Sequence, residues 1–120
     1  MSIETLLDAL KQENGPDRVL DTEISVLIGY RKIVDEADAG APKVSWLHHS
    51  GKGRANIPRY TAYIQHARGL AELVAPQHGG ACRWDESGGG ARINDEPVSM
   101  ASSPAIALCL AALNHRQHFP

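Results

Sequence analysis

Six histidines are the side chains of this sequence best suited to metal binding or proton transfer. His48 and His49 are adjacent, so on a strand they point to opposite faces and do not share a metal ion. His115 and His118 have the spacing of one helical turn, but neither a cysteine nor a carboxylate stands beside them. Because a structural zinc site needs several convergent ligands, we expect surface histidines and no bound metal.

The basic loop SGKGRANIPR places Lys52, Arg54 and Arg59 around two glycines. Backbone N–H groups in such loops can hold a phosphate group. The stretch lacks the GxxxxGK[ST] pattern of a Walker loop, so a solvated loop is the simpler interpretation. We keep as an alternative function the binding of a phosphorylated ligand or nucleic acid through these three cations. His49 and His66 complete the candidate contact residues, and either would be the base of an enzyme, the least favoured hypothesis.

The two cysteines belong to no recognisable motif. Cys109 lies in an apolar segment, where a thiol behaves as a small hydrophobe. Cys82 and Trp84 alternate onto one face of an expected strand. We expect these side chains and Trp46 in the core, whereas exposed tryptophans and tyrosines would mark a protein interface. Six carboxylates fall in or near expected turns, namely Asp35, Glu36, Asp85, Glu86, Asp95 and Glu96. The sequence therefore indicates no catalytic residue and no cofactor, and a protein that is not an enzyme.

Composition is that of an ordinary globular protein, with 42% hydrophobic residues and a formal net charge of −2. The 120 residues suit one domain, residues 1–120. The charge gives no basic footprint, so nucleic acid is the less favoured partner. No apolar run approaches the roughly 20 residues that span a membrane. The first residues lack the regions of a signal peptide, and the cysteines suggest a reducing compartment, so we expect a cytoplasmic location in a host cell.

Apolar periodicity and capping signals predict four helices. Ser2 caps the first, which ends at Gly15, and the second covers residues 17–28. Thr61 is expected to cap a third helix that reaches residue 74. Ser103 begins the last one, because its hydroxyl can cap the helix and Pro104 suits the first helical position.

Two hairpins are expected between these helices. One joins residues 33–34 to residues 44–47, and the other turns at SGGG, while residues 95–101 read as a loop. The order ααββαββα predicts an α+β fold of sandwich type, in which a small antiparallel sheet packs with about four helices.

The last helix has no polar side chain between Ala105 and Leu113. A helix that is apolar all round is buried on all sides. We therefore expect the sheet, the other helices or a second subunit to cover it, and a homodimer is compatible with this pattern.

Three stretches, in the order GPDRVLDTEISVLIGYRK, IPRYTAYIQHARGLAELVAP and SSPAIALCLAALNHR, resemble the phage α-β-α sandwich domain family. These are small proteins of tailed phages and prophages. Tyr63 departs from the small serine common in the family, and His66 and Arg68 fall in a segment that is usually DAAL. The resemblance implies an α+β sandwich fold and implies no activity.

The absence of a catalytic constellation and the resemblance lead to one functional expectation. The chain would be a small phage- or prophage-encoded accessory protein that acts by protein–protein contact. By analogy of size and origin, it could modulate a host enzyme or an anti-phage defence such as CRISPR.

Overall fold

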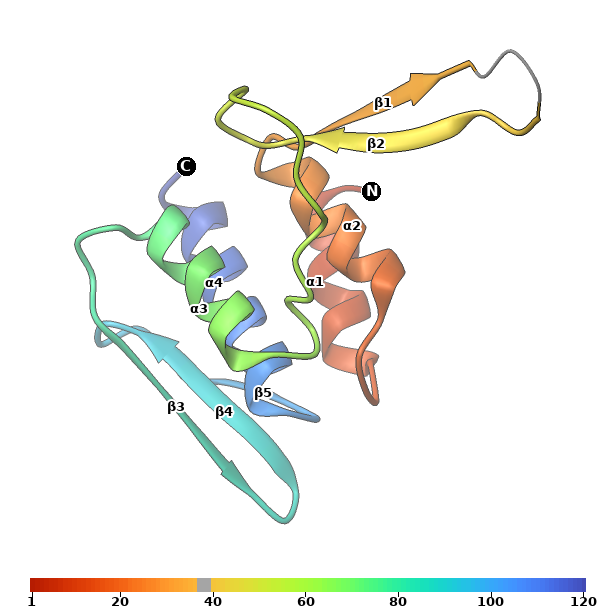
Figure 1. Ribbon diagram of the computed structural model, residues 1–120. Helices are drawn as coiled ribbons and strands as arrows, with labels where there is room; N and C mark the ends of the chain where they lie inside the picture. The colour runs from red at the N-terminus through yellow and green to blue at the C-terminus, as the bar shows by residue number, and fades with distance from the viewer. Residues whose placement is uncertain (37–39) are drawn as a thin grey trace.

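Figure 1 shows the chain as a computed structural model, which describes residues 1–36 and 40–120. The helices of this part are α1 (Ile3–Gln12), α2 (Arg18–Leu27), α3 (Ile64–Val74) and α4 (Pro104–His118). The strands are β1 (Arg31–Asp35), β2 (Lys43–Leu47), β3 (Gly80–Asp85), β4 (Gly88–Ile93) and β5 (Ser99–Ala101). The predicted α+β class and the four helices are confirmed, with the order ααββαβββα.

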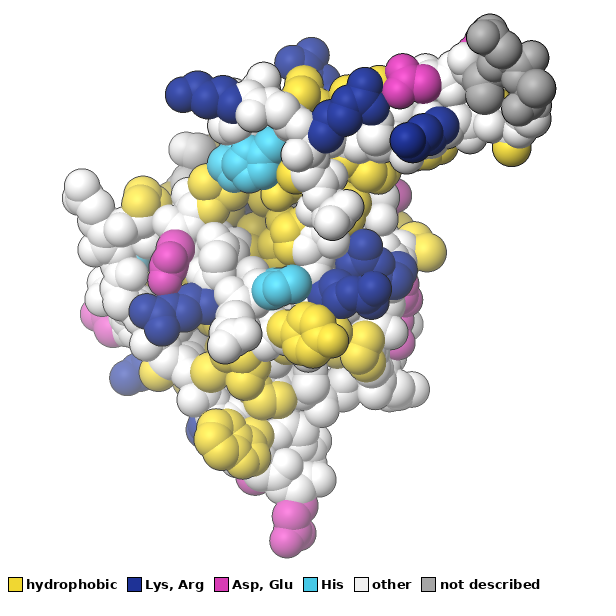
Figure 2. Space-filling view, in the orientation of Figure 1, with side chains coloured by type: hydrophobic (Ala, Val, Ile, Leu, Met, Phe, Trp, Pro, Cys, Tyr) yellow, Lys and Arg dark blue, Asp and Glu magenta, His cyan; other side chains and the backbone are white. Residues whose placement is uncertain are grey.

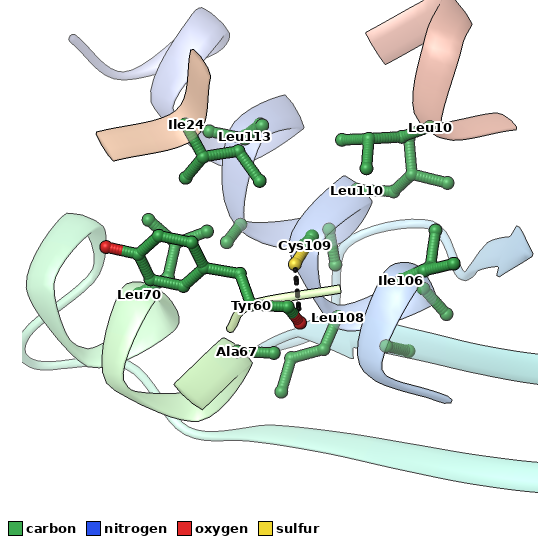
Figure 3. Packing of buried hydrophobic residues seen from close by; sticks show 14 of the residues in the cluster. Leu10, Ile24, Tyr60, Ala67, Leu70, Ile106, Leu108, Cys109, Leu110 and Leu113 are labelled. Carbon is green, nitrogen blue, oxygen red and sulfur yellow. Dashed lines mark hydrogen bonds between the residues drawn. The ribbon is translucent and has the colours of Figure 1, made fainter. Parts of the chain in front are cut away.

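Helix α4 is the centre of the core (Figure 3). The Ser103 hydroxyl accepts a hydrogen bond from the N–H of Ile106 at 3.2 Å, and Pro104 opens the helix as predicted. Every residue from Ala105 to Leu113 is buried. Helices α1 and α3 contact α4, and so do β3, β4 and β5. The apolar helix is therefore covered within one chain. No helix among the described residues is long and apolar enough to cross a membrane.

Local capping explains where the first two helices begin. The Ser2 hydroxyl accepts a hydrogen bond from the N–H of Thr5, and the Asp17 carboxylate accepts from the N–H groups of Val19 and Leu20. Side chains with a short oxygen satisfy N–H groups that the first helical turn leaves unpaired. Both helices then turn their leucine and isoleucine stripe into the core around α4.

The strands form two sheets rather than the single sheet expected. Strands β1 and β2 pair as an antiparallel hairpin that projects from the body (Figure 1). The second sheet has the order β3-β4-β5 and is antiparallel throughout. The prediction of a loop over residues 95–101 is wrong, because Ser99–Ala101 pair with residues 89–91 of β4. A strand of three residues is too short to show the alternation by which strands are recognised.

The second hairpin turns at Glu86 and Ser87, one step before the predicted SGGG turn. The three glycines belong to β4 instead. A Cβ on Gly89 would overlap the backbone of Ser103 and Pro104. Glycine is needed here because the start of α4 lies directly against the strand.

The tryptophans do not fill the core. Trp84 is 74% exposed and Trp46 is only partly buried. Cys82, expected in the core, is partly buried at its edge, whereas Cys109 is fully buried as predicted. Aliphatic side chains and Tyr60 fill the space around α4 in their place.

Candidate functional site

A cleft of about 770 Å³ opens beside α3 and gathers three of the five predicted contact residues. We call it the Tyr–His cleft. In Figure 2 its hydrophobic floor is visible between α3 and the extended segment that precedes it. His49, Arg59 and His66 line it, whereas Lys52 and Arg54 do not. The other lining residues are Ile28, Tyr30, Asn56, Ile57, Pro58, Tyr60, Tyr63, Gly69, Leu70, Glu72 and Leu73.

Tyrosines form the floor and the rim of the cleft. Tyr30 and Tyr60 are buried, and this burial raises the pKa of both hydroxyls, so they stay protonated at neutral pH. At the rim, Tyr63 is 53% and Leu73 is 40% exposed. The cleft thus combines an apolar floor with an apolar, accessible rim.

One wall of the cleft is the strap, which we define as residues 54–63. Arg18 on α2 donates hydrogen bonds to the carbonyls of Ile57 at 3.1 Å and Pro58 at 3.2 Å. Thr61 binds Asp21 on the same helix through its N–H and its hydroxyl, at 2.9 and 2.8 Å. The strap is therefore fixed to α2 at two points, residues 57–58 and residue 61.

The prediction that Thr61 caps the third helix is wrong. Helix α3 begins at Ile64, and its cap residue, Tyr63, makes no side-chain capping hydrogen bond. The hydroxyl of Thr61 instead donates to the carboxylate of Asp21 on α2. We call the hydrogen bonds that join the strap to Arg18 and Asp21 the clamp. Helix α4 also contacts the strap, because the Cys109 thiol donates a hydrogen bond to the carbonyl of Tyr60 at 3.4 Å (Figure 3).

His66 is held in one orientation by the strap. Its Nδ1 accepts a hydrogen bond from the backbone N–H of Arg59 at 2.7 Å. A ring nitrogen that accepts carries no proton, so the neutral ring has its proton on Nε2. The ring of Tyr63 lies edge-on at 5.3 Å. His66 contacts Arg59 through Nδ1, so its Nε2–H group remains available as a hydrogen-bond donor.

His48 and His49 lie together, against the prediction that they point to opposite faces. Their ring centroids are 4.0 Å apart, and the Tyr30 ring is 5.3 Å from the first and 5.7 Å from the second. Strand β2 ends at Leu47, so strand alternation does not apply to them. Burial lowers the pKa of His49, and the neighbouring His48 lowers it further.

His115 is also not the surface histidine that the sequence suggested. It is 5% exposed, and its Nδ1 lies 2.7 Å from a carboxylate oxygen of Glu96. The rings of His78 and Phe119 pack on it, at 5.1 and 4.9 Å. Within residues 1–36 and 40–120, no three His, Cys, Asp or Glu side chains converge well enough to hold a metal ion.

A second hollow of about 600 Å³ lies on the other side of the strap and is lined by Arg18, Arg54 and Arg59. We call it the arginine groove. Arg54 is paired with Asp35 at 3.1 Å and also contacts the Ser45 hydroxyl. The guanidinium of Arg59 makes no ion pair with any residue that the structure describes. Arg59 lines both hollows and so connects them.

The cleft is lined by apolar and aromatic side chains with a few polar groups among them. Among the described residues that line it there is no serine, threonine, cysteine or aspartate, and the carboxylate of Glu72 is paired with Arg68 at 2.8 Å. The nearest thiol, that of Cys109, is fully buried, and burial raises its pKa, so it stays protonated. Apolar walls with a few fixed polar groups are typical of ligand-binding pockets of this size.

Sequence reasoning found the histidines and Arg59 but not the rest of the cleft. Tyr30 and Gly69 carry no motif, and their role depends on how α2 and α3 face each other. No family model, curated protein or solved structure matches the chain, so its resemblance to the phage family stays a prediction.

Proposed function

We propose that this chain is a non-enzymatic binding module that holds a segment of a partner protein in the Tyr–His cleft. The observation that carries the proposal is the cleft itself, with Tyr63 and Leu73 exposed at its rim. Tyrosine is among the residues that dominate binding energy at protein interfaces. An apolar anchor residue of the partner would lie on the floor formed by Tyr30 and Tyr60.

Charge supports a partner segment that is acidic. Residues 31–72 include seven of the twelve Lys and Arg residues but four of the fourteen Asp and Glu residues, and Glu72, which lines the cleft, is paired with Arg68 at 2.8 Å. The guanidinium of Arg59, which makes no ion pair with a described residue, stands where the cleft meets the arginine groove. Complementary charge at such a rim increases the association rate and selects against basic partners.

Gly69 offers a direct test. It lines the cleft from α3, and a Cβ at this position would meet no atom within 4 Å. Gly69→Leu extends a branched apolar side chain from the wall of the cleft, and Gly69→Ala, which adds only the Cβ, is the matched control. Peptides selected from a random library displayed on yeast should share an apolar residue beside acidic ones. We expect Gly69→Leu to weaken their binding at least about tenfold and Gly69→Ala to leave it nearly unchanged.

Two results would contradict the proposal. A library from which no peptide is enriched would argue against a peptide-binding cleft. Enriched peptides that bind Gly69→Leu as tightly as the native chain would show that they use another surface. The origin in a phage and an effect on a host enzyme or defence system remain predictions, which the cleft does not address.

A second candidate function is the binding of a phosphorylated ligand in the arginine groove. It is favoured by the three guanidinium groups that line this hollow, with Asn56 between it and the cleft. The groove replaces the predicted loop site in part, because it includes Arg54 and Arg59 but not Lys52. Adenosine and AMP, titrated in parallel by NMR, separate the contribution of the phosphate group.

The phosphate hypothesis requires AMP to bind more tightly than adenosine and Arg59→Ala to remove that difference. Arg92→Ala, a change at an exposed arginine of β4, is the control. Equal binding of the two compounds would exclude a phosphate site here.

A further inference from the structure

Strand β3 leaves one edge of the three-stranded sheet open. It pairs with β4 on one side, and no described strand lies on the other. Natural proteins often protect such an edge with proline, lysine or a covering loop. Strand β3 has neither proline nor lysine, and its one basic residue, Arg83, is paired with Asp85 at 3.2 Å. The backbone groups of this edge can therefore pair with another strand.

The hairpin register shows which residues supply those groups. Asp85 and Gly88 flank the two-residue turn, and in such hairpins this closing pair exchanges hydrogen bonds. Because hydrogen-bonded and non-hydrogen-bonded pairs alternate, Arg83 and Ala81 also turn their backbone groups toward β4. Gly80, Cys82 and Trp84 turn theirs outward. The open edge thus has three residues available for pairing.

Trp84 is the most exposed large hydrophobic side chain among the described residues, at 74%. The β3–β4 hairpin extends past the helices that cover the rest of the sheet (Figure 1), so the indole has little to pack against in its own chain. An indole left in water at this position is a potential interface anchor.

A hollow that could receive such a side chain lies at the other end of the same strand. It has a volume of about 450 Å³ between α3 and β3, and Gly80 lines it together with Ile64, Ala71, Cys82, Ile93 and Leu108. We call it the β3 hollow. Gly80 contributes no side chain of its own, so the hollow stays open toward the strand edge.

We propose that two copies of this chain associate through their β3 edges, with Trp84 of each copy in the β3 hollow of the other. Antiparallel pairing centred on Cys82 places Cys82 opposite its own copy and Trp84 opposite Gly80. All three outward-facing residues then meet outward-facing residues, and the sheet becomes six-stranded. An aromatic side chain packed over a glycine on the neighbouring strand is a known stabilising arrangement.

Another register is disfavoured by charge. Centring the pair on Arg83 would place two guanidinium groups directly opposite each other, which is destabilising. It would also leave Gly80 outside the paired region. The register centred on Cys82 has no like charges opposite each other and uses the exposed indole. Of these two registers, charge and the exposed indole favour the one centred on Cys82.

Sedimentation velocity from micromolar to millimolar concentration tests the association. We expect a monomer–dimer equilibrium for the native chain, and a fall in the association constant of at least about tenfold for Trp84→Ala. Trp84→Lys, which adds a charge to the same edge, should give a monomer. Phe119→Ala removes an aromatic side chain that is 63% exposed elsewhere and is the control.

Isotope-filtered NMR on a mixture of labelled and unlabelled chains tests the arrangement. Contacts between the indole of Trp84 and the methyl groups of Ile93 and Leu108 should arise between chains. A native chain that is monomeric at all concentrations would overturn the proposal. So would a dimer that persists in both Trp84 variants or lacks these contacts. Circular dichroism would confirm that both variants are folded, as the exposure of Trp84 leads us to expect.

Discussion

Asp21 and Thr61 are 40 residues apart in the sequence, and one carboxylate oxygen joins them. Oδ1 of Asp21 accepts the backbone N–H of Thr61 at 2.9 Å and its hydroxyl at 2.8 Å. Oδ2 accepts from Arg18 at 3.0 Å. The carboxylate of Asp21, which is 1% exposed, therefore accepts three hydrogen bonds. These bonds hold the strap in the position that forms the cleft.

The clamp predicts a large loss of stability when the carboxylate is removed. Asp21→Ala removes the ion-pair partner of Arg18 and leaves the buried N–H of Thr61 without an acceptor, whereas the Thr61 hydroxyl can still donate to the carbonyl of Asp17 at 3.2 Å. We therefore expect a loss of about 1–3 kcal/mol in the free energy of unfolding. Urea denaturation measures it. Asp8→Ala, at an exposed position of α1, is the control and should change stability by less than about 0.5 kcal/mol. A loss below about 1 kcal/mol at Asp21 would mean that the clamp contributes little.

Gly69 predicts a gain in stability. Glycine in a helix costs roughly 0.5–1 kcal/mol relative to alanine, because the unfolded chain has more freedom to lose. Gly69 lies within α3 and a Cβ there meets no atom within 4 Å. We expect Gly69→Ala to raise the free energy of unfolding by up to about 1 kcal/mol in thermal or urea denaturation. A destabilised variant would show that the helix is strained at this position.

The burial of Leu110 predicts the opposite effect. It is 1% exposed at the centre of α4. Leu110→Ala should lower the free energy of unfolding by about 2–5 kcal/mol through the cavity it leaves. Leu110→Asp places a charge without a partner in the same space, and we expect this variant to be unfolded by circular dichroism. A soluble, folded Leu110→Asp protein would contradict complete coverage of α4.

The parts of the fold that the sequence predicted are those set by neighbouring residues. Ser2 and Ser103 cap their helices as predicted, and Asp17, predicted only as the start of the second helix, caps it in the same local way. Thr61 is also a residue that commonly caps helices, but its hydroxyl donates to Asp21, which is 40 residues away in the sequence. Trp84 alternates correctly with its neighbours, yet its exposure depends on how far the hairpin extends beyond the helices.

For the candidate site, the sequence predicts individual residues but not which of them lie together. The sequence indicates Arg59 and His66 separately, each by its chemistry, and the hydrogen bond between them depends on the turn into α3. Lys52 belongs to the same basic loop but precedes the strap, and the strap lines the cleft only from Asn56 onward. The pairing of His115 with Glu96 depends on the course of the chain after β4, which no local pattern specifies.

The environment of His49 predicts a pH dependence of stability. Burial, and then the neighbouring His48, lower its pKa in the folded protein below the ordinary value of 6.5. The unfolded chain therefore binds more protons between the two pKa values, and stability rises with pH wherever this holds. As the pH falls from about 6.5 through the lower folded pKa, the contribution of His49 is lost. We expect His49→Asn to lose less free energy of unfolding than the native chain over this window, in urea denaturation at a series of pH values. Parallel curves for the two proteins would exclude His49 as a source of the dependence.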